Sequence, residues 1–303
     1  MPDSRPTVVC FGEILWDFLP DALYPGGAPF NVACHLQRRG VHAHLVSAIG
    51  RDLLGDELAR RVRHEGLEVT GLTRHQGLPT GYVRAALGAG GDAQYEIAGS
   101  VAWDQITPGE DSVRAAHGAR AIVYGSLALR STYNRAALDR LLAIACARPE
   151  RSAAPEPWRV FDVNLRPPFD DLAVVRDVAR RSSLIKLNQA EAARFAGGEP
   201  GFGREEGHAR AIAAASGCGT VCVTAGAHGA GFLRQGEWTW ETGRSVAVVD
   251  TIGAGDAFLA ALVAGLVLGE DDPARLLARA CRLGEWVAAR RGAIAPYDSA
   301  TPA

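Results

Sequence analysis

The sequence Asp250-Thr251-Ile252-Gly253-Ala254-Gly255-Asp256 is followed at once by an apolar segment, residues 257–268, that predicts a buried helix. Small residues let the backbone turn tightly and present free N–H groups. A helix that starts just after them adds its unpaired amides and the positive end of its dipole, which suits an anion. Asp256 places a carboxylate beside this loop, and an anion site with an adjacent base suggests phosphoryl transfer to an alcohol. The structural alternative is a flexible loop with Asp256 as the helix cap.

The composition excludes several classes of protein. The 303 residues are 48% hydrophobic and 22% charged, which predicts a globular chain with a large core. The net charge of −2 argues against nucleic acid or an anionic membrane as the main partner. Lys186 is the single lysine and follows Ile185, so the Gly-Lys-Ser/Thr of a Walker phosphate loop is absent. The dinucleotide motif GxGxxG is absent too.

No apolar run is long enough to span a bilayer and the cysteines form no CxxC pair, so we expect a cytoplasmic protein.

Strand-like and helix-like segments alternate along most of the chain. The strand-like segments are residues 8–12, 44–49, 121–125, 159–164, 184–187, 221–224 and 246–249. The helix-like segments are residues 29–39, 55–65, 132–148, 172–182, 205–216, 256–268 and 274–290. This alternation predicts an α/β fold with a mainly parallel sheet between two layers of helices. Ligands in such folds bind at the carboxyl ends of the strands. We expect one domain over residues 1–303.

Two regions depart from this alternation and predict a small β-sheet lid, at about residues 13–28 and 78–102. Residues 80–87 and 93–98 have the pattern of two strands, and the turn-forming sequence Gly88-Ala89-Gly90-Gly91-Asp92 joins them. A lid that closes over a site excludes water, which a phosphoryl transferase requires so that its nucleotide is not hydrolysed.

Further polar residues occur where predicted strands end. Asp162, Asn164 and Arg166 alternate at the end of one strand, so we expect all three to face one way. The fork of Arg166 could hold a hydroxyl or a phosphate oxygen, although a polar strand end paired with a neighbouring loop is an open alternative. Asn188 and Glu191 have the spacing of a capping box. The same pair could instead orient the water molecules of Mg²⁺.

A glycine-rich turn follows the strand that ends at Thr224. Gly226 and Gly229 let this turn approach the phosphates or base of a nucleotide. The same turn could equally form a hairpin to a next strand at residues 232–234.

The Gly26-Gly27 pair precedes another predicted helix, in which Pro29 suits the first turn. Paired glycines suit a hinge between lid and core. Asn31, near the helix start, could bond the hydroxyls of a substrate or cap the helix. Asp17 lies in the first predicted lid strand, where its carboxylate could accept two hydroxyl hydrogen bonds or simply be exposed.

In this order the motifs resemble the ribokinase-like (PfkB) carbohydrate kinases over nearly the whole chain. Residues 26–33 are similar to the N-terminal signature of that family, and residues 250–256 to the C-terminal one. The motifs between them follow the family's order: Asp162-x-Asn164-x-Arg166, Asn188-x-x-Glu191 and Thr224-x-Gly226-x-x-Gly229. Residues 11–17 and 95–97 further resemble the bacterial fructokinase branch.

The resemblance implies a ribokinase-like fold and an ATP-dependent sugar kinase that acts with Mg²⁺ on a primary hydroxyl, with fructose as the expected sugar. Asp256 would be the base, and the amides of Gly253, Ala254 and Gly255 would stabilise charge on the transferring phosphoryl group. The residues expected to hold the sugar are Asp17, Gly27, Asn31 and Arg166. Those expected to bind the nucleotide are Asn188, Thr224, Gly226 and Gly229, with Glu191 supporting Mg²⁺ through water.

The resemblance also implies a K⁺ site, because members of this family often bind K⁺ near the C-terminal signature. Asp250 and the carbonyls at Ile252 and around residues 290–292 would supply it, but Pro296 stands where some relatives have a serine ligand. A homodimer is left open. Alternative acceptors are ribose, 2-keto-3-deoxygluconate and a nucleoside. An alternative of another class is a non-catalytic sugar sensor, against which the intact Asp256 argues because a sensor needs no base.

Overall fold

The computed structural model describes residues 4–19, 22–87, 93–147 and 155–302. Its central sheet is formed by β1 (Thr7–Phe11), β4 (His42–Gly50), β5 (Leu72–His75), β8 (Ala119–Gly125), β9 (Trp158–Asp162), β10 (Leu184–Asn188), β11 (Thr220–Thr224), β12 (Gly229–Arg234) and β13 (Glu237–Thr242). Their order in space is β13-β12-β11-β10-β9-β8-β1-β4-β5. Neighbouring strands from β5 across to β11 are parallel, and β12 and β13 extend the sheet in antiparallel fashion.

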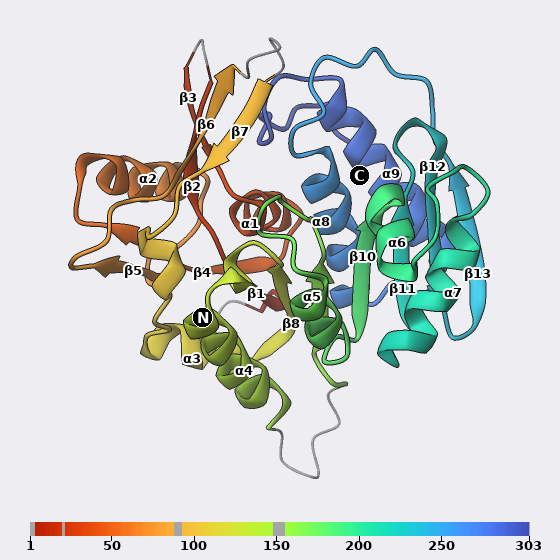
Figure 1. The fold of residues 1–303 in the computed structure, drawn as a ribbon, viewed down its shortest axis with the longest axis horizontal. Coiled ribbons are helices and arrows are strands. Elements are labelled where there is room, and N and C mark those ends of the chain that lie inside the picture. The colour runs from red at the N-terminus through yellow and green to blue at the C-terminus, as the bar shows by residue number, and fades with distance from the viewer. Residues whose placement is uncertain (1–3, 20–21, 88–92, 148–154, 303) are drawn as a thin grey trace.

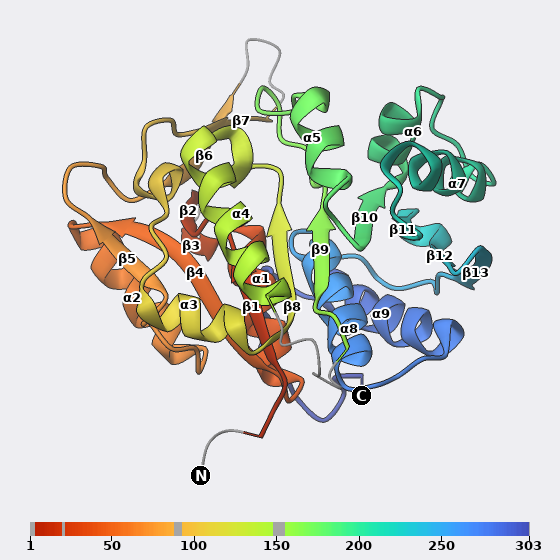
Figure 2. The same ribbon diagram turned by 90° about the horizontal axis from the view of Figure 1, so that it is seen from below.

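Helices cover both faces of this sheet (Figure 2). One face carries α1 (Ala28–Arg38), α2 (Leu53–His64), α8 (Ala254–Val267) and α9 (Pro273–Ala288). The other carries α3 (Glu110–His117), α4 (Thr132–Cys146), α5 (Leu172–Ala179), α6 (Gln189–Ala196) and α7 (Glu205–Ser216). Alternation along β1 builds both cores, because Val8 and Cys10 join one cluster whereas Val9 and Phe11 join the other. The predicted three-layer α/β/α architecture is confirmed.

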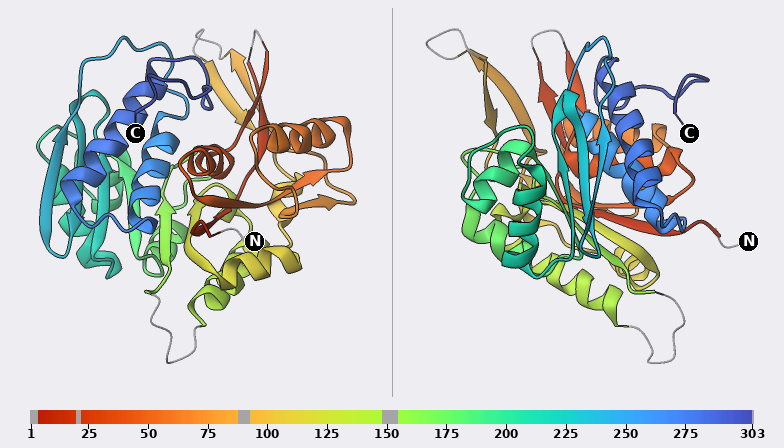
Figure 3. Two further views of the ribbon diagram at one scale, coloured as in Figure 1. Left: turned by 180° about the vertical axis from the view of Figure 1, so that it is seen from behind. Right: turned by 90° about the vertical axis from the view of Figure 1, so that its right-hand side faces the viewer.

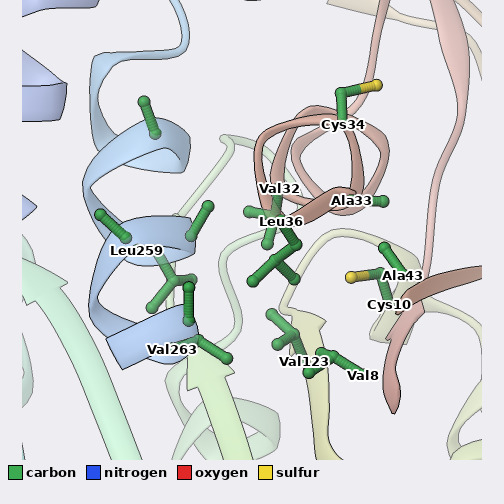
Figure 4. Close-up of a cluster of buried hydrophobic side chains, with 14 of the residues drawn as sticks. Val8, Cys10, Val32, Ala33, Cys34, Leu36, Ala43, Val123, Leu259 and Val263 are labelled. Atoms are coloured by element: carbon green, nitrogen blue, oxygen red, sulfur yellow. The ribbon is translucent and has the colours of Figure 1, made fainter. Parts of the chain in front are cut away.

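Helix α8 is the most deeply buried helix of the first face. Every residue from Ala257 to Val267 is buried, as expected for a helix that is apolar on all sides. Figure 4 shows Val32 and Leu36 of α1 pointing towards Leu259 and Val263 of α8. No helix among the described residues is both long and apolar enough to cross a membrane.

A second, smaller sheet stands out from one end of the main body (Figures 1 and 3). Its strands are β2 (Leu15–Phe18), β3 (Leu23–Gly26), β6 (Tyr82–Leu87) and β7 (Ala93–Ile97), in the order β3-β2-β6-β7. Parallel pairing of β2 with β6 joins two distant parts of the chain, and the rings of Phe18 and Tyr82 stack with centroids 5.2 Å apart. The predicted small sheet is confirmed. Its predicted turn at residues 88–92 lies outside the described residues.

The predicted strand at residues 246–249 is wrong. The valines in this segment are exposed, and the chain there forms no ladder, although the amide of Val249 donates to the carbonyl of Ala288. Their β-branched side chains gave a strand-like pattern, but the sheet already ends at β13, one segment earlier. Sequence analysis missed β13, in which Trp238 and Trp240 alternate with polar residues, and it also missed β5 and α3.

Replacing Leu259 tests the packing of α8. Leu259 is fully buried against α1, so we expect Leu259→Ala to lower the free energy of unfolding by about 2–5 kcal/mol through the lost contacts and the cavity. Urea unfolding followed by circular dichroism measures this. The matched control is Leu268→Ala at the end of the same helix, where the side chain is 57% exposed and a loss of at most about 0.5 kcal/mol is expected. Equal losses at both positions would contradict this description of the core.

Candidate functional site

The polar motifs converge at the carboxyl ends of three adjacent parallel strands. Asp162 ends β9, Asn188 ends β10 and Thr224 ends β11. The register sets Lys186 opposite Asp162, and Asn188 opposite Thr224. This edge of the sheet is where α/β folds bind ligands. These three motifs therefore lie at one edge of the central sheet.

The N-terminal turns of α1 and α8, which lie side by side (Figure 1), complete this edge. Nδ2 of Asn31 donates a hydrogen bond to Oδ2 of Asp256 over 2.8 Å. Helix α8 begins at Ala254, two residues earlier than predicted, and its N-cap is Gly253 without a side-chain cap. The alternative that Asp256 merely caps the helix is therefore wrong. Its carboxylate points to a residue of another helix instead.

Gly253 is required by the geometry of the loop. Its φ of 77° lies in the left-handed region that favours glycine. A Cβ at this position would also lie 2.5 Å from Cα of Ala293. Only glycine meets both constraints, and with glycine here the loop can turn sharply into α8. The first amides of the helix then point out of its N-terminal end. An anion cradle at Gly253–Gly255 is thus compatible with the backbone.

The carboxyl group of Asp256 is buried among charged side chains that shift its pKa. Burial and then the charge of Asp162 raise its pKa, and the hydrogen bond from Asn31 and the charges of Lys186 and Arg166 lower it, for a result of about 6. A carboxyl with a pKa near 6 is ionised at neutral pH and accepts a proton more readily than an ordinary aspartate.

Two of the other residues expected to hold a sugar, Asp17 and Arg166, interact electrostatically with Asp256. Burial raises the pKa of the Asp17 carboxyl to about 6, and the charges that act on it most are those of Arg166 and Asp256. A Cβ at Gly27, whose φ is 109°, would overlap the backbone carbonyl of Glu13. The structure thus brings Asp17, Arg166 and Asp256 within electrostatic reach of one another, at the Gly27 junction between the small sheet and α1.

Sequence analysis missed Glu13 in this group. Its side chain is buried, Oε1 accepts the amide of Ala28 at 3.3 Å, and Oε2 has no hydrogen-bond partner among the described residues. Burial raises the pKa of Glu13 to about 7, with Asp256 adding to the shift and Arg166 opposing it. A glutamate after a buried strand has no local pattern that marks it, because its hydrogen-bond partner Ala28 lies 15 residues further along the chain.

The expectation that Asp162, Asn164 and Arg166 form one strand face is wrong. Strand β9 ends at Asp162, and Asn164 takes a positive φ of 38°, which redirects the chain. Arg166 lies in a turn in which its carbonyl accepts the amide of Phe169 at 2.8 Å. Its side chain is exposed and forms no ion pair with the residues that the structure describes, so its guanidinium is available to a ligand.

Asn188 and Glu191 form the capping box that their spacing predicted. Oδ1 of Asn188 accepts the amide of Glu191, and Oε2 of Glu191 accepts the amide of Asn188, both at 2.9 Å. The other oxygen of Glu191 accepts the amide of Leu165 at 2.8 Å. Glu191 therefore ties the start of α6 to the loop that carries Arg166. With both oxygens engaged, it suits contact with Mg²⁺ through water better than direct coordination.

The turn after Thr224 is the hairpin that the sequence allowed. Residues Gly226–His228 form a short 3₁₀ turn, and Gly229 begins β12, which pairs with β11. Gly226 has a φ of 57° and Gly229 a φ of 115°. A Cβ at Gly229 would overlap the backbone of Glu241, so the hairpin packs tightly against β13. The same turn lies at the sheet edge that carries the other motifs.

Lys186 is the second functional candidate that sequence analysis missed. Its Nζ donates to Oδ1 of Asp162 over 3.0 Å, and both side chains are buried. A Cβ at Gly255 would lie 3.2 Å from Nζ, which places the ammonium against the first turn of α8. Burial by itself lowers the pKa of Lys186, but the carboxylates of Asp162, Glu191 and Asp256 together raise it above its ordinary value, so Lys186 is charged.

Comparison with known proteins identifies the family of this chain. Residues 9–300 match the model of the pfkB family carbohydrate kinases. The chain belongs to the pfkB family of carbohydrate kinases. It is 27% identical to fructokinase-2 of Solanum lycopersicum over 324 residues, covering 99% of this chain and 95% of that protein.

Two solved structures have the same ribokinase-like fold. The fructokinase of Xylella fastidiosa with bound ATP superimposes with a TM-score of 0.80 at 21% identity, covering 98% of this chain and 95% of that one. The fructokinase of Vibrio cholerae O395, in its fructose-, ADP- and calcium-bound form, gives a TM-score of 0.79 at 23% identity, covering 96% of each chain. The fold class predicted from the sequence is thereby confirmed.

In this pfkB family member, Asp250 braces the loop that leads to the site. Oδ1 of Asp250 accepts the amide of Ile252 at 2.9 Å, and Oδ2 accepts the amide of Gly292 at 3.1 Å. The carboxylate thus links the loop before α8 to the turn after α9, which is the region where K⁺ was expected. Among the described residues no group of three His, Cys, Asp or Glu side chains is arranged to hold a metal ion.

The pKa of Asp256 tests the geometry of this site without any ligand. The Asn31 amide donates to the ionised carboxylate and stabilises the charged form, so Asn31→Ala should raise the pKa of Asp256 above the value near 6. Carboxyl ¹³C resonances followed through a pH titration measure this shift. Asn188→Ala is the control, because Asn188 bonds Glu191 instead. A pKa of Asp256 that is unchanged in Asn31→Ala would contradict the hydrogen bond.

Proposed function

We propose that this protein is an ATP-dependent sugar kinase that transfers the γ-phosphoryl group to a primary hydroxyl, with fructose as its acceptor. The observation that carries the proposal is the position of Asp256. It lies in the first turn of α8, beside Gly253–Gly255, and is held by Asn31 within electrostatic reach of Asp17 and Arg166. We therefore assign the base, the anion cradle and the hydroxyl-binding groups to one edge of the central sheet.

In the proposed reaction Asp256 accepts the proton of the attacking hydroxyl. The hydroxyl oxygen forms a bond to the γ-phosphorus as the bond from that phosphorus to the β,γ-bridging oxygen breaks, and the bonding electrons leave with ADP. The transition state of such transfers is loose, so alignment and charge stabilisation matter more than a strong base. The hydrogen bond from Asn31 fixes the direction in which the carboxylate of Asp256 faces.

The amides of Gly253, Ala254 and Gly255 would stabilise the charge on the transferring phosphoryl group, with the dipole of α8 behind them. Asn188, Thr224, Gly226 and Gly229, at the ends of β10 and β11, would line the nucleotide site. Mg²⁺, when bound with ATP, neutralises phosphate charge. We expect the ion to be held by nucleotide phosphates and water, because the oxygens of Glu191 already accept hydrogen bonds from backbone amides.

The sugar would lie between Asp256 and the small sheet, held by Asp17, Asn31, Arg166 and the backbone at Gly27. We propose that residues 1–303 act as one kinase domain and that the small sheet is the lid. It meets the core at Gly27, whose left-handed φ of 109° suits a hinge. Fructose as the acceptor is supported by the fructokinase names of the relatives.

Three further expectations stay predictions. K⁺ near Asp250 would be bound by carbonyl oxygens of the same loop. Both carboxylate oxygens of Asp250 accept hydrogen bonds from backbone amides. A cytoplasmic location follows from the composition and the cysteine pattern. A homodimer formed through the lid is the third prediction, which a measurement of the oligomeric state tests.

A substrate panel tests the proposed function. Purified protein with ATP and Mg²⁺ should release ADP with fructose and form a sugar phosphate, whereas ribose, glucose, 2-keto-3-deoxygluconate and adenosine should react more slowly. Coupled detection of ADP and mass spectrometry of the product measure both. Faster turnover with another acceptor in the panel would make that compound the substrate in place of fructose. Tight sugar binding with no ATP binding would replace the kinase by a sugar sensor.

Removing the base separates catalysis from binding. We expect Asp256→Asn to lower kcat by about 10²–10⁴-fold, because the hydroxyl loses its proton acceptor, while the Kd of the sugar stays near that of the wild type. In the wild type, kcat/KM should be half its plateau value near pH 6 and fall further at lower pH, because protonated Asp256 cannot accept a proton. Isothermal titration calorimetry and pH-rate profiles measure these effects. Loss of sugar affinity equal to the loss of rate would make Asp256 a binding residue instead.

A further inference from the structure

The single lysine of this chain occupies an unusual position. The sequence has 32 basic residues, and all of them except Lys186 are arginines. Lys186 is also buried, with its side chain 8% exposed, whereas most charged side chains lie at protein surfaces. On β10 its neighbours Ile185 and Leu187 belong to the core on the other face of the sheet. Lys186 therefore points to the face that carries α8.

The ammonium meets α8 at its N-terminal end. Nζ would be 3.2 Å from a Cβ at Gly255, so the absence of a side chain there is what makes room for it. The N-terminus of a helix is already positive, and cations are normally favoured at the other end. A buried ammonium at this end requires anionic partners. Asp162 supplies one at 3.0 Å, and it is the single described residue that accepts a hydrogen bond from Nζ.

An ammonium has three N–H donors, so this pairing leaves donors of Lys186 unused within the described residues. Asp162 is incompletely paired as well, because its Oδ2 is buried without a partner. Lysine is a compact point charge, whereas the planar fork of arginine is larger. Nζ of Lys186 lies close to both Asp162 and Gly255, which suits a compact charge. The unused donors of the Lys186 ammonium and the first amides of α8 thus lie at the same glycine loop.

We propose that Lys186 is a catalytic residue whose ammonium contacts the transferring phosphoryl group, and that Asp162 is the positioning residue that aims it. This proposal rests on the proposed kinase function and adds a charge that the glycine loop alone lacks. As the acceptor oxygen attacks, negative charge spreads over the oxygens of the phosphoryl group. Lys186 approaches those oxygens from the sheet side, and the amides of Gly253–Gly255 approach them from the start of α8. No proton leaves Lys186 in this step.

Because the chain has one lysine, selective labelling gives one set of side-chain signals. Protein labelled with [¹³C,¹⁵N]lysine should show a single lysine Cε–Hε correlation, absent from Lys186→Met, which assigns it. We expect this signal to shift when wild-type protein is saturated with a non-hydrolysable ATP analogue and Mg²⁺, and to shift less with ADP. This readout requires no sugar and no turnover.

Two outcomes separate the proposals. If the ATP analogue binds by calorimetry and the lysine signal does not move, Lys186 does not contact the phosphoryl group, and the kinase proposal stands. If neither ATP nor its analogue binds to folded protein, the proposed function itself is overturned.

Kinetics of a charge-balanced variant complete the test. Lys186→Met/Asp162→Asn removes both buried charges together, which avoids leaving one of them unpaired. We expect kcat to fall by about 10²–10³-fold, the range found when one donor to a developing anion is removed, with the sugar Kd within about twofold. The matched control neutralises the exposed pair on α7, Arg210→Met/Glu206→Gln, and should keep wild-type kcat. Wild-type kcat in the Lys186 variant, or equal losses in both variants, would overturn the proposal.

Discussion

The hydrogen bond between Asn31 and Asp256 joins the first turns of two helices that are 225 residues apart in the sequence. One of these helices begins directly after Gly27, where the small sheet meets the core, and the other begins at the glycine loop. The apolar contact between α1 and α8 holds the two helices side by side (Figure 4). The direction of the proposed base therefore depends on the packing between these two helices.

Charge balance sets the chemistry of the site. Burial of Asp17 and Asp256 raises both pKa values to about 6, and the guanidinium of Arg166 opposes both shifts. Lys186 further lowers the pKa of Asp256, whereas Asp162 raises it. These opposed effects leave Asp256 ionised at neutral pH yet more basic than an exposed aspartate. An anionic phosphoryl group would meet positive potential from α8 and Lys186, while the acceptor hydroxyl meets carboxylates.

Sequence reasoning predicted what depends on local pattern. The glycine loop, the apolar helix behind it and the capping box of Asn188 are set by residues close in sequence, and all are present in the structure. The strand predicted at residues 246–249 was wrong because β-branched residues favour extended backbone but do not show whether a sheet edge lies beside them. The hydrogen bonds of Glu13 and Lys186 join them to residues at least 15 positions away in the sequence. Such contacts come from strand register and helix packing, which no local pattern encodes.

The most direct test of the central claim is a crystal structure with fructose, Mg²⁺, ADP and aluminium fluoride, which imitates the transferring phosphoryl group. The account predicts a fructose primary hydroxyl within hydrogen-bond distance of a carboxylate oxygen of Asp256, aligned with the fluoride complex. That complex should accept hydrogen bonds from the amides of Gly253–Gly255. A sugar bound with its hydroxyls away from Asp256, or a fluoride complex away from the start of α8, would contradict the account.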